Sequence, residues 1–103
     1  MALFDVNNLD TTIHGPIRLG ALSILQMDGP LDFTTIKKRL GVTDGSLGSH
    51  LRKLEDAGYI EAKKKFIGRR PNTSYRMTPK GRKAFKLYLN AMRSLVETME
   101  GKG

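Results

Sequence analysis

Residues 34–58 read TTIKKRLGVTDGSLGSHLRKLEDAG, and this stretch predicts two short helices joined by a tight turn. Ile36 and Leu40 are four residues apart and can share one face of the first helix. Gly41 can end that helix because glycine adopts the left-handed conformation without steric cost. Thr43 can cap the second helix by accepting a hydrogen bond from a free backbone N–H of its first turn. The rest of the chain has to pack around this two-helix unit.

The second of these helices has an apolar side and a polar side. Leu47, Leu51 and Leu54 recur at i, i+4 and i+7 and form the apolar stripe, and Gly58 stands where the helix ends. The opposite side is small, polar and partly cationic. It carries Gly45, Ser49, Arg52 and Asp56, with Ser46 and Lys53 beside them. Such a narrow face suits the major groove of DNA, although paired amphipathic helices also occur in folds with no nucleic-acid role.

Length and composition limit the kinds of protein this chain can be. Its 103 residues suffice for about one domain with a single modest core. The sequence has no cysteine, which excludes disulfides, thiolate metal sites and thiol nucleophiles. No apolar run is long enough to cross a bilayer, and the N-terminus lacks the basic start and long apolar segment of a signal peptide. We therefore expect a soluble, cytoplasmic protein.

The net charge of +8 is concentrated in one segment. Residues 61–83 hold nine cations and one anion, whereas the rest of the chain holds nine of each. Clustered cations repel one another unless a polyanion neutralises them, so the segment predicts a polyanionic partner. DNA, RNA and an anionic membrane surface all qualify, and charge alone does not separate them.

Three shorter elements are predicted before the two-helix unit. Residues 1–12 mix apolar residues with Asn, Asp and Thr and predict an arm or short helix that packs on another element. A helix is expected from about residue 13 or 16 to Met27, because Pro16 suits a first helical position and Asp28-Gly29-Pro30 stops a helix. Residues 31–33 are short and alternating, which is compatible with an edge strand.

Two alternating segments after the unit predict a β-hairpin. In residues 59–66 one face is expected to point inward, and it carries Ile60, Ala62, Lys64 and Phe66. In residues 74–78 the inward residues are Tyr75 and Met77. Residues 67–73 then predict a loop somewhat longer than usual, in which Gly68 and Pro71 flank Arg69 and Arg70. Arginines at such a tip suit the narrow minor groove, and the alternative is an ordinary solvated charge cluster.

A long last helix is predicted from Pro79 to about Glu100, with Thr78 as its cap. At 1.5 Å per residue its 22 residues span roughly 33 Å, which exceeds the reach of a compact domain of this size. Part of its apolar stripe therefore needs another surface, and the same helix of a second copy is expected there because two-fold homodimers are the commonest assemblies. The predicted interface residues are Phe85, Tyr88, Leu89, Met92, Leu95, Val96 and Met99. Folding back over the N-terminal arm is the alternative, and both arrangements are compatible.

Three stretches carry a resemblance to a known family. They are HGPIRL at 14–19, TDGSLGSHLRKLEDAGYI at 43–60 and GRRPNTSYRMTPKGR at 68–82. With the predicted order of elements, the chain resembles small prokaryotic winged helix-turn-helix transcription regulators, MarR-like first and ArsR-like nearby. The resemblance implies a mainly α fold with a small β-sheet (α+β), forming one winged-helix DNA-binding domain. Its expected parts are an arm (1–12), a helix-turn-helix (34–58), a wing hairpin (59–78) and a dimerisation helix (79–100).

The resemblance also implies a function, namely a sequence-specific regulator that binds double-stranded DNA as a homodimer. The second helix of the unit would enter the major groove, and the wing would contact the minor groove or the backbone. The recognition-helix candidates are Asp44, Gly45, Ser46, Ser49, His50 and Lys53, and the outward cation Arg52 joins them. The wing candidates are Lys65, Arg69 and Arg70, to which the basic strands add Lys63 and Arg76.

Other kinds of function fit the sequence less well. ArsR-like regulators often sense metals through cysteine or histidine clusters, and His14 and His50 alone supply too few ligands, so no metal or other cofactor is expected. MarR-like regulators usually have longer chains with a small-molecule pocket, for which this chain has little room. Ser49 and His50 point about 100° apart on a helix and cannot pair for catalysis, so we expect no enzyme. An architectural DNA-coating protein and a protein-interaction module remain the alternatives.

Overall fold

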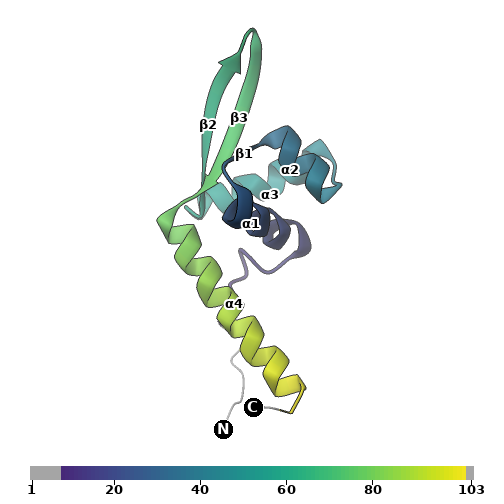
Figure 1. The fold of residues 1–103 in the computed structure, drawn as a ribbon, viewed down its shortest axis with the longest axis vertical. Helices are drawn as coiled ribbons and strands as arrows, with labels where there is room; N and C mark the ends of the chain where they lie inside the picture. Colours follow the sequence, from purple (N-terminus) through teal and green to yellow (C-terminus); the bar gives the residue numbers. More distant parts are fainter. Residues whose placement is uncertain (1–7, 102–103) are drawn as a thin grey trace.

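A computed structural model describes residues 8–101 and contains four helices and a three-stranded antiparallel sheet (Figure 1). The elements in chain order are α1 (Pro16–Asp28), β1 (Leu31–Asp32), α2 (Phe33–Leu40), α3 (Asp44–Asp56), β2 (Ile60–Ile67), β3 (Arg70–Met77) and α4 (Pro79–Met99). This is the winged helix-turn-helix order that the sequence predicts. The first seven residues of the expected N-terminal arm lie outside the described part of the chain.

Local chemistry fixes the ends of the two-helix unit. Gly41 has a φ of +66° and ends α2, and the Thr43 hydroxyl accepts a hydrogen bond from the Ser46 N–H at 3.2 Å to begin α3. Both predictions are confirmed. The expected strand at 31–33 is one residue too long, because the Asp32 carboxylate caps α2 by accepting from the Thr35 N–H at 2.8 Å. Phe33 is therefore the first helical residue.

The core lies where α1, α2 and α3 meet the base of the hairpin and the first half of α4. Leu47, Leu51 and Leu54 are fully buried, which confirms the inward stripe of α3. Around them lie Ile13, Leu22, Ile36 and Tyr88, also buried. Among residues 8–101, no helix is long and apolar enough to cross a membrane.

The hairpin differs from the sequence prediction at its tip. β2 and β3 stay paired from Ile60↔Met77 to Ile67↔Arg70, so the turn has only the two residues Gly68 and Arg69 instead of a long loop over 67–73. Gly68 has a φ of +64°, and glycine at this first central position is typical of a type II′ hairpin turn.

Pro71, which suggested a loop, is compatible with the strand. Ile67 and Arg70 flank the two-residue turn and form a hydrogen-bonded pair, so the next pair, Phe66 and Pro71, is a non-hydrogen-bonded one. The ladder requires no N–H from proline there. The predicted loop residues therefore continue the strand to its end.

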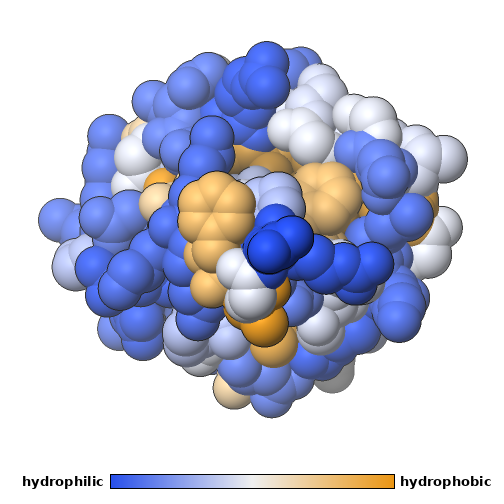
Figure 2. Space-filling model, turned by 90° about the horizontal axis from the view of Figure 1, so that it is seen from above, coloured by the Kyte–Doolittle hydropathy of each residue, from blue (hydrophilic) through white to orange (hydrophobic). Residues whose placement is uncertain are grey.

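The prediction that Phe66 and Lys64 point into the core is wrong. Ile60 and Met77 at the hairpin base are buried, but both faces of the outer half are solvated because the hairpin projects beyond the helices. Phe66 is 73% exposed and its neighbour Ile67 is 60% exposed. Figure 2, which looks down onto the hairpin end, shows apolar side chains beside strongly hydrophilic ones at the centre of this view.

α4 begins against the hairpin base and then leaves the body in the direction opposite to the hairpin (Figure 1). Thr78 caps it by accepting from the Gly81 N–H at 2.9 Å, while its hydroxyl donates to the Gly58 carbonyl at 2.6 Å. Gly81 lets α4 pack closely on the backbone at Tyr59, since a Cβ there would stand 2.0 Å from the Tyr59 carbonyl oxygen. Hairpin and α4 together give the molecule a longest dimension of 59 Å.

Candidate nucleic-acid interface

The outward face of α3 is solvent-accessible and carries small side chains over its first half. Ser49, Arg52 and Lys53 are exposed, and with two glycines they line a shallow hollow along the helix. Apart from its chain neighbours and the adjacent backbone of α3, a Cβ added at Gly45 or Gly48 would meet no described atom within 4 Å. Glycine inside a helix costs about 1 kcal/mol relative to alanine, so internal packing does not account for these two residues. Without side chains at these two positions, the backbone of α3 is accessible to close approach by a binding partner.

Two predicted recognition residues at the start of α3 already have partners within the chain. The Asp44 carboxylate lies 2.8 Å from the Lys37 ammonium and joins the two helices of the unit. Ser46 is half-buried, and its backbone N–H is the donor to the Thr43 cap. Both residues therefore stabilise the start of α3, and the Asp44 side chain remains largely exposed.

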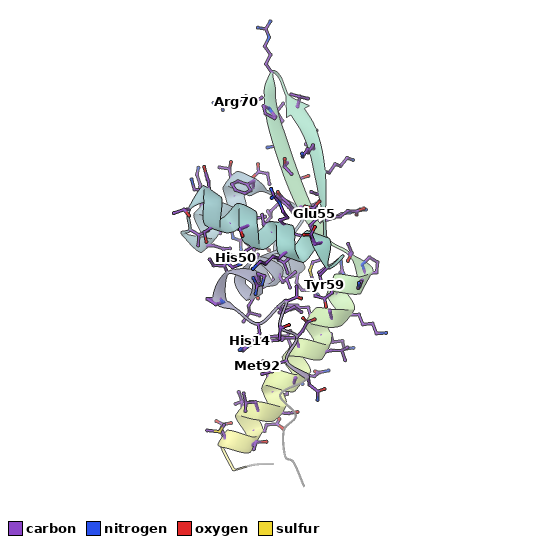
Figure 3. The ribbon with its side chains drawn as sticks, turned by 180° about the vertical axis from the view of Figure 1, so that it is seen from behind. His14, His50, Glu55, Tyr59, Arg70 and Met92 are labelled. Atoms are coloured by element: carbon purple, nitrogen blue, oxygen red, sulfur yellow. The ribbon has the colours of Figure 1, made fainter. Side chains whose placement is uncertain are left out.

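His50 faces α1 rather than the outward side of α3 (Figure 3). The Arg18 guanidinium lies 2.9 Å from the His50 Nδ1, and because guanidinium can only donate, Nδ1 accepts and the ring proton is on Nε2. Burial, followed by the nearby charges of Arg18 and Lys53, lowers the pKa of His50. A direct base contact is not what this geometry favours, and only the Nε2–H is left for a phosphate.

Arg18 is the residue that sequence reasoning missed. It also donates to the Thr12 carbonyl at 2.6 Å, so one guanidinium ties the segment before α1 to the recognition helix. Its position on α1 is half-buried, and periodicity does not distinguish it from a solvated cation. The sequence contains no local signal for a contact between residues 32 positions apart.

Most of the predicted wing cations project into solvent. Lys63, Lys65 and Arg70 are exposed on one face of the hairpin. Arg69 is exposed in the two-residue turn at its end. Arg76 differs, because its guanidinium lies 2.7 and 2.8 Å from the carboxylate of Glu61 on the neighbouring strand. Glu61 therefore neutralises the charge of Arg76 near the hairpin base. Arg70 lies at the far end of the hairpin (Figure 3).

The other face of the hairpin looks toward α3. Tyr75 lies on this face, close enough to Glu55 and Arg52 of α3 for their charges to act on its hydroxyl. Burial is the main cause that raises the pKa of Tyr75, and Glu55 raises it further. Lys64 and Phe66 lie on the same face of β2 as Ala62, which pairs with Tyr75. The outward face of α3 and this wing face are therefore neighbours.

The predicted dimer residues of α4 divide into three groups by burial. Phe85 and Tyr88 are buried in the core of their own chain, so assigning them to an interface with another copy was wrong. The reason is that the first half of α4 packs on the hairpin base and on the segment before α1. Met92 and Leu95 are half-buried, whereas Leu89, Val96 and Met99 are exposed.

Within residues 8–101 no group of three His, Cys, Asp or Glu side chains could hold a metal ion. The candidate interface described above is built from backbone, hydroxyl groups and cations. Such groups bind phosphates and the polar edges of bases.

Two proteins of Methanocaldococcus jannaschii are similar in sequence over nearly their whole lengths. The uncharacterized protein MJ0432 is 38% identical over 82% of this chain and 91% of its own length. The uncharacterized HTH-type transcriptional regulator MJ0229 is 32% identical over 87% of this chain and 88% of its own length.

Solved structures show the same fold. A transcriptional regulator homologue from Pyrococcus horikoshii OT3 matches with a TM-score of 0.81 and 29% identity over 90% of this chain and 93% of that one. MarR matches with a TM-score of 0.77 and 18% identity, over 90% of this chain and 67% of its own. The Mycobacterium tuberculosis regulator MOSR, solved in complex with DNA, has a TM-score of 0.71 and 15% identity, over 94% and 69%. An ArsR family regulator is also among the fold neighbours.

The family model described as "Winged helix DNA-binding domain" matches residues 17–96. This range covers α2, α3 and both strands of the wing in full, α1 except its first residue, and α4 except its last three. The predicted resemblance is confirmed, and this chain belongs to the winged helix DNA-binding domain family.

Proposed function

We propose that this protein is a sequence-specific transcription regulator that binds double-stranded DNA as a homodimer. The observation that carries the proposal is the outward face of α3, which has small side chains and free space beside Gly45 and Gly48, next to a projecting cationic hairpin. A relative named as an HTH-type transcriptional regulator and a fold neighbour solved with DNA support it.

The two parts of the surface would have different tasks. Ser49, Arg52 and Lys53 stand on the exposed face of α3, where a major groove could receive them and where Gly45 and Gly48 let the backbone approach. The wing cations would neutralise phosphates and release counterions, which gives affinity without sequence preference. These cations are Lys63, Lys65, Arg69 and Arg70.

A second copy would pair through the outer half of α4. That part of the helix lies beyond the body, and Val96 and Met99 stay exposed there. Pairing two chains about a two-fold axis would cover these side chains and present two α3 helices to one side of a duplex. If the two helices stand about one DNA turn apart, roughly 34 Å, the target is an inverted repeat.

The test is a selection of tight binders from random duplexes, followed by anisotropy titrations on the enriched site. An inverted repeat should emerge, and Ser49→Ala or Lys53→Ala should change base preference within its half-sites. Arg69→Ala combined with Arg70→Ala should weaken binding to every duplex and reduce the salt slope by about one for each phosphate that the wing no longer neutralises.

The alternatives give different results in the same experiment. An architectural DNA-coating protein would bind with a steep salt dependence but enrich no sequence. A protein-interaction module would show no salt-sensitive affinity for duplex DNA. Either result would contradict the proposal.

A further inference from the structure

The end of the wing carries an apolar group among its cations. Phe66 is 73% exposed, Ile67 is 60% exposed, and Pro71 lies opposite Phe66 across the strands. Lys64, Lys65, Arg69 and Arg70 surround this apolar tip, which we define as Phe66, Ile67 and Pro71. Figure 2, which looks down onto the hairpin end, shows hydrophobic and strongly hydrophilic side chains next to each other at the centre of the view.

The fold itself does not use these side chains. Phe66 lies six residues beyond buried Ile60, which at about 3.3 Å per residue places it roughly 20 Å from the hairpin base. The hairpin extends away from the helices there, so the core does not reach Phe66 (Figure 1). A polar β-former such as threonine would satisfy the strand equally well at a solvated position. An exposed phenylalanine is therefore explained better by a partner than by folding.

Charge complementarity points to a polyanion, and the position of this wing face beside the outward face of α3 favours a DNA duplex among the polyanions. Four cations around the tip would bind phosphates on both sides of a groove, and the apolar tip would then face the edges of the base pairs. Proteins that bind the minor groove use apolar wedges, Phe, Ile and Pro among them, to part adjacent base pairs and bend the duplex. Phe66 and Pro71 form one such projection on the wing face that looks toward α3.

We infer that Phe66 is a wedge that inserts between base pairs in the minor groove and partly unstacks one step on each side of the operator. This inference rests on the proposed function. It adds a source of specificity, because pyrimidine–purine steps such as TA and CA unstack most easily and should be enriched where the wing lands. The phosphate contacts of the arginines would hold the wedge in register.

The fluorescent base 2-aminopurine can report the unstacking when it is placed in turn at adenines outside the selected half-sites. Unstacking should raise its fluorescence at one step when the wild-type protein binds. The chain contains no tryptophan, so the Phe66→Trp variant has a single indole, and its emission should be quenched on the duplex by contact with the bases. Phe66→Ser should abolish the 2-aminopurine signal and bind about tenfold more weakly, with an unchanged salt slope because no charge is removed.

Met27→Ser is the matched control, since Met27 is 69% exposed at the end of α1 and lies outside the wing. It should keep both the affinity and the 2-aminopurine signal. If anisotropy shows tight binding while every 2-aminopurine position stays dark and Phe66→Ser binds normally, the wedge is wrong and the proposed function stands. If no duplex binds at all, both fail. A blue shift of the indole on phosphatidylserine vesicles without quenching on DNA would overturn the wedge in favour of a membrane contact.

Discussion

The hydroxyl of Tyr88 on α4 lies 2.7 Å from Nδ1 of His14, in the segment that precedes α1. The centroids of the two rings are 5.9 Å apart, and the ring planes are tilted by 49° to each other. Tyr88 is almost completely buried. A second contact ties the same segment to the residue just before β2, because the Tyr59 hydroxyl donates to the carboxylate of Asp10. The first half of α4 is thus anchored to the DNA-binding body, so a partner helix on its outer half would be held in a fixed relation to α3.

Removing the Tyr88 hydroxyl should weaken this anchor. Tyr88→Phe keeps the ring and its packing and should lower the free energy of unfolding by about 1 kcal/mol, the usual net contribution of one hydrogen bond. Urea denaturation measures the decrease. In a His14→Ala background the same change should cost clearly less, because the partner is already absent. Equal costs in both backgrounds would mean that the two side chains do not interact energetically.

Alanine at Gly48 should separate stability from binding. The position is inside α3 and has room for a Cβ, so Gly48→Ala should raise the free energy of unfolding by about 0.5–1 kcal/mol through helix propensity. The same methyl group should reduce DNA affinity, because it narrows the approach to the hollow beside Ser49. Thermal denaturation and anisotropy measure the two effects. A more stable protein with unchanged affinity would remove Gly48 from the DNA surface.

Burial of His50, together with the charge of Arg18 beside it, makes stability depend on pH. Because the pKa of His50 is lowered below its ordinary 6.5 in the folded protein, the unfolded chain takes up this proton first as the pH falls. The contribution of His50 is therefore complete above pH 6.5 and is lost below it, down to the pKa of the folded state. Asp32 does not affect stability in this pH range. Its pKa is lowered mainly by the hydrogen bonds from Thr35, so its contribution to stability is lost only as the pH falls below about 3.8.

We expect His50→Gln to flatten the pH dependence of stability. The glutamine amide oxygen can still accept from Arg18 but does not titrate. Urea midpoints at pH 7.5 and 5.5 should differ less for this variant than for the wild-type protein. An identical difference in the two proteins would show that another group causes it.

Sequence reasoning predicted the elements whose cause is local. The leucine stripe of α3, the glycine end of α2 and the caps Thr43 and Thr78 follow from spacing and from single-residue chemistry, and the structure confirms them. What failed depends on distant neighbours. Alternation shows which face of β2 carries Phe66, but only the extent of the body decides whether anything covers that face.

The same limit explains the errors about pairing and interfaces. The composition of 67–73 is typical of a loop, and only the two-residue turn at Gly68-Arg69 reveals that both strands continue to the tip. Along α4, spacing identifies one apolar stripe but not how much of it the chain buries itself. The contacts that decide this, such as the one between His14 and Tyr88, join residues 74 positions apart and leave no periodic signal.

The exposed half of α4 should decide the oligomeric state. Val96 is 49% exposed on the side of α4 that continues the buried stripe, so Val96→Asp would place a charge in the proposed interface while leaving the core of each chain intact. We expect sedimentation to show dimers for the wild-type protein and monomers for the variant, and affinity for an inverted repeat should fall toward that for a single half-site. Met92 is a poorer choice, because it is half-buried against the core and its replacement would also affect folding.

Leu87 supplies the control for this experiment. It is 59% exposed on the same helix but nine residues before Val96, and at about 100° per residue the two side chains point to opposite sides. Leu87→Asp adds the same charge to α4 and should leave the dimer unchanged if the stripe through Val96 is the interface. Dimers that persist in Val96→Asp but dissociate in Leu87→Asp would move the interface to the other side of α4. Dimers that persist in both variants would place the contact outside this helix.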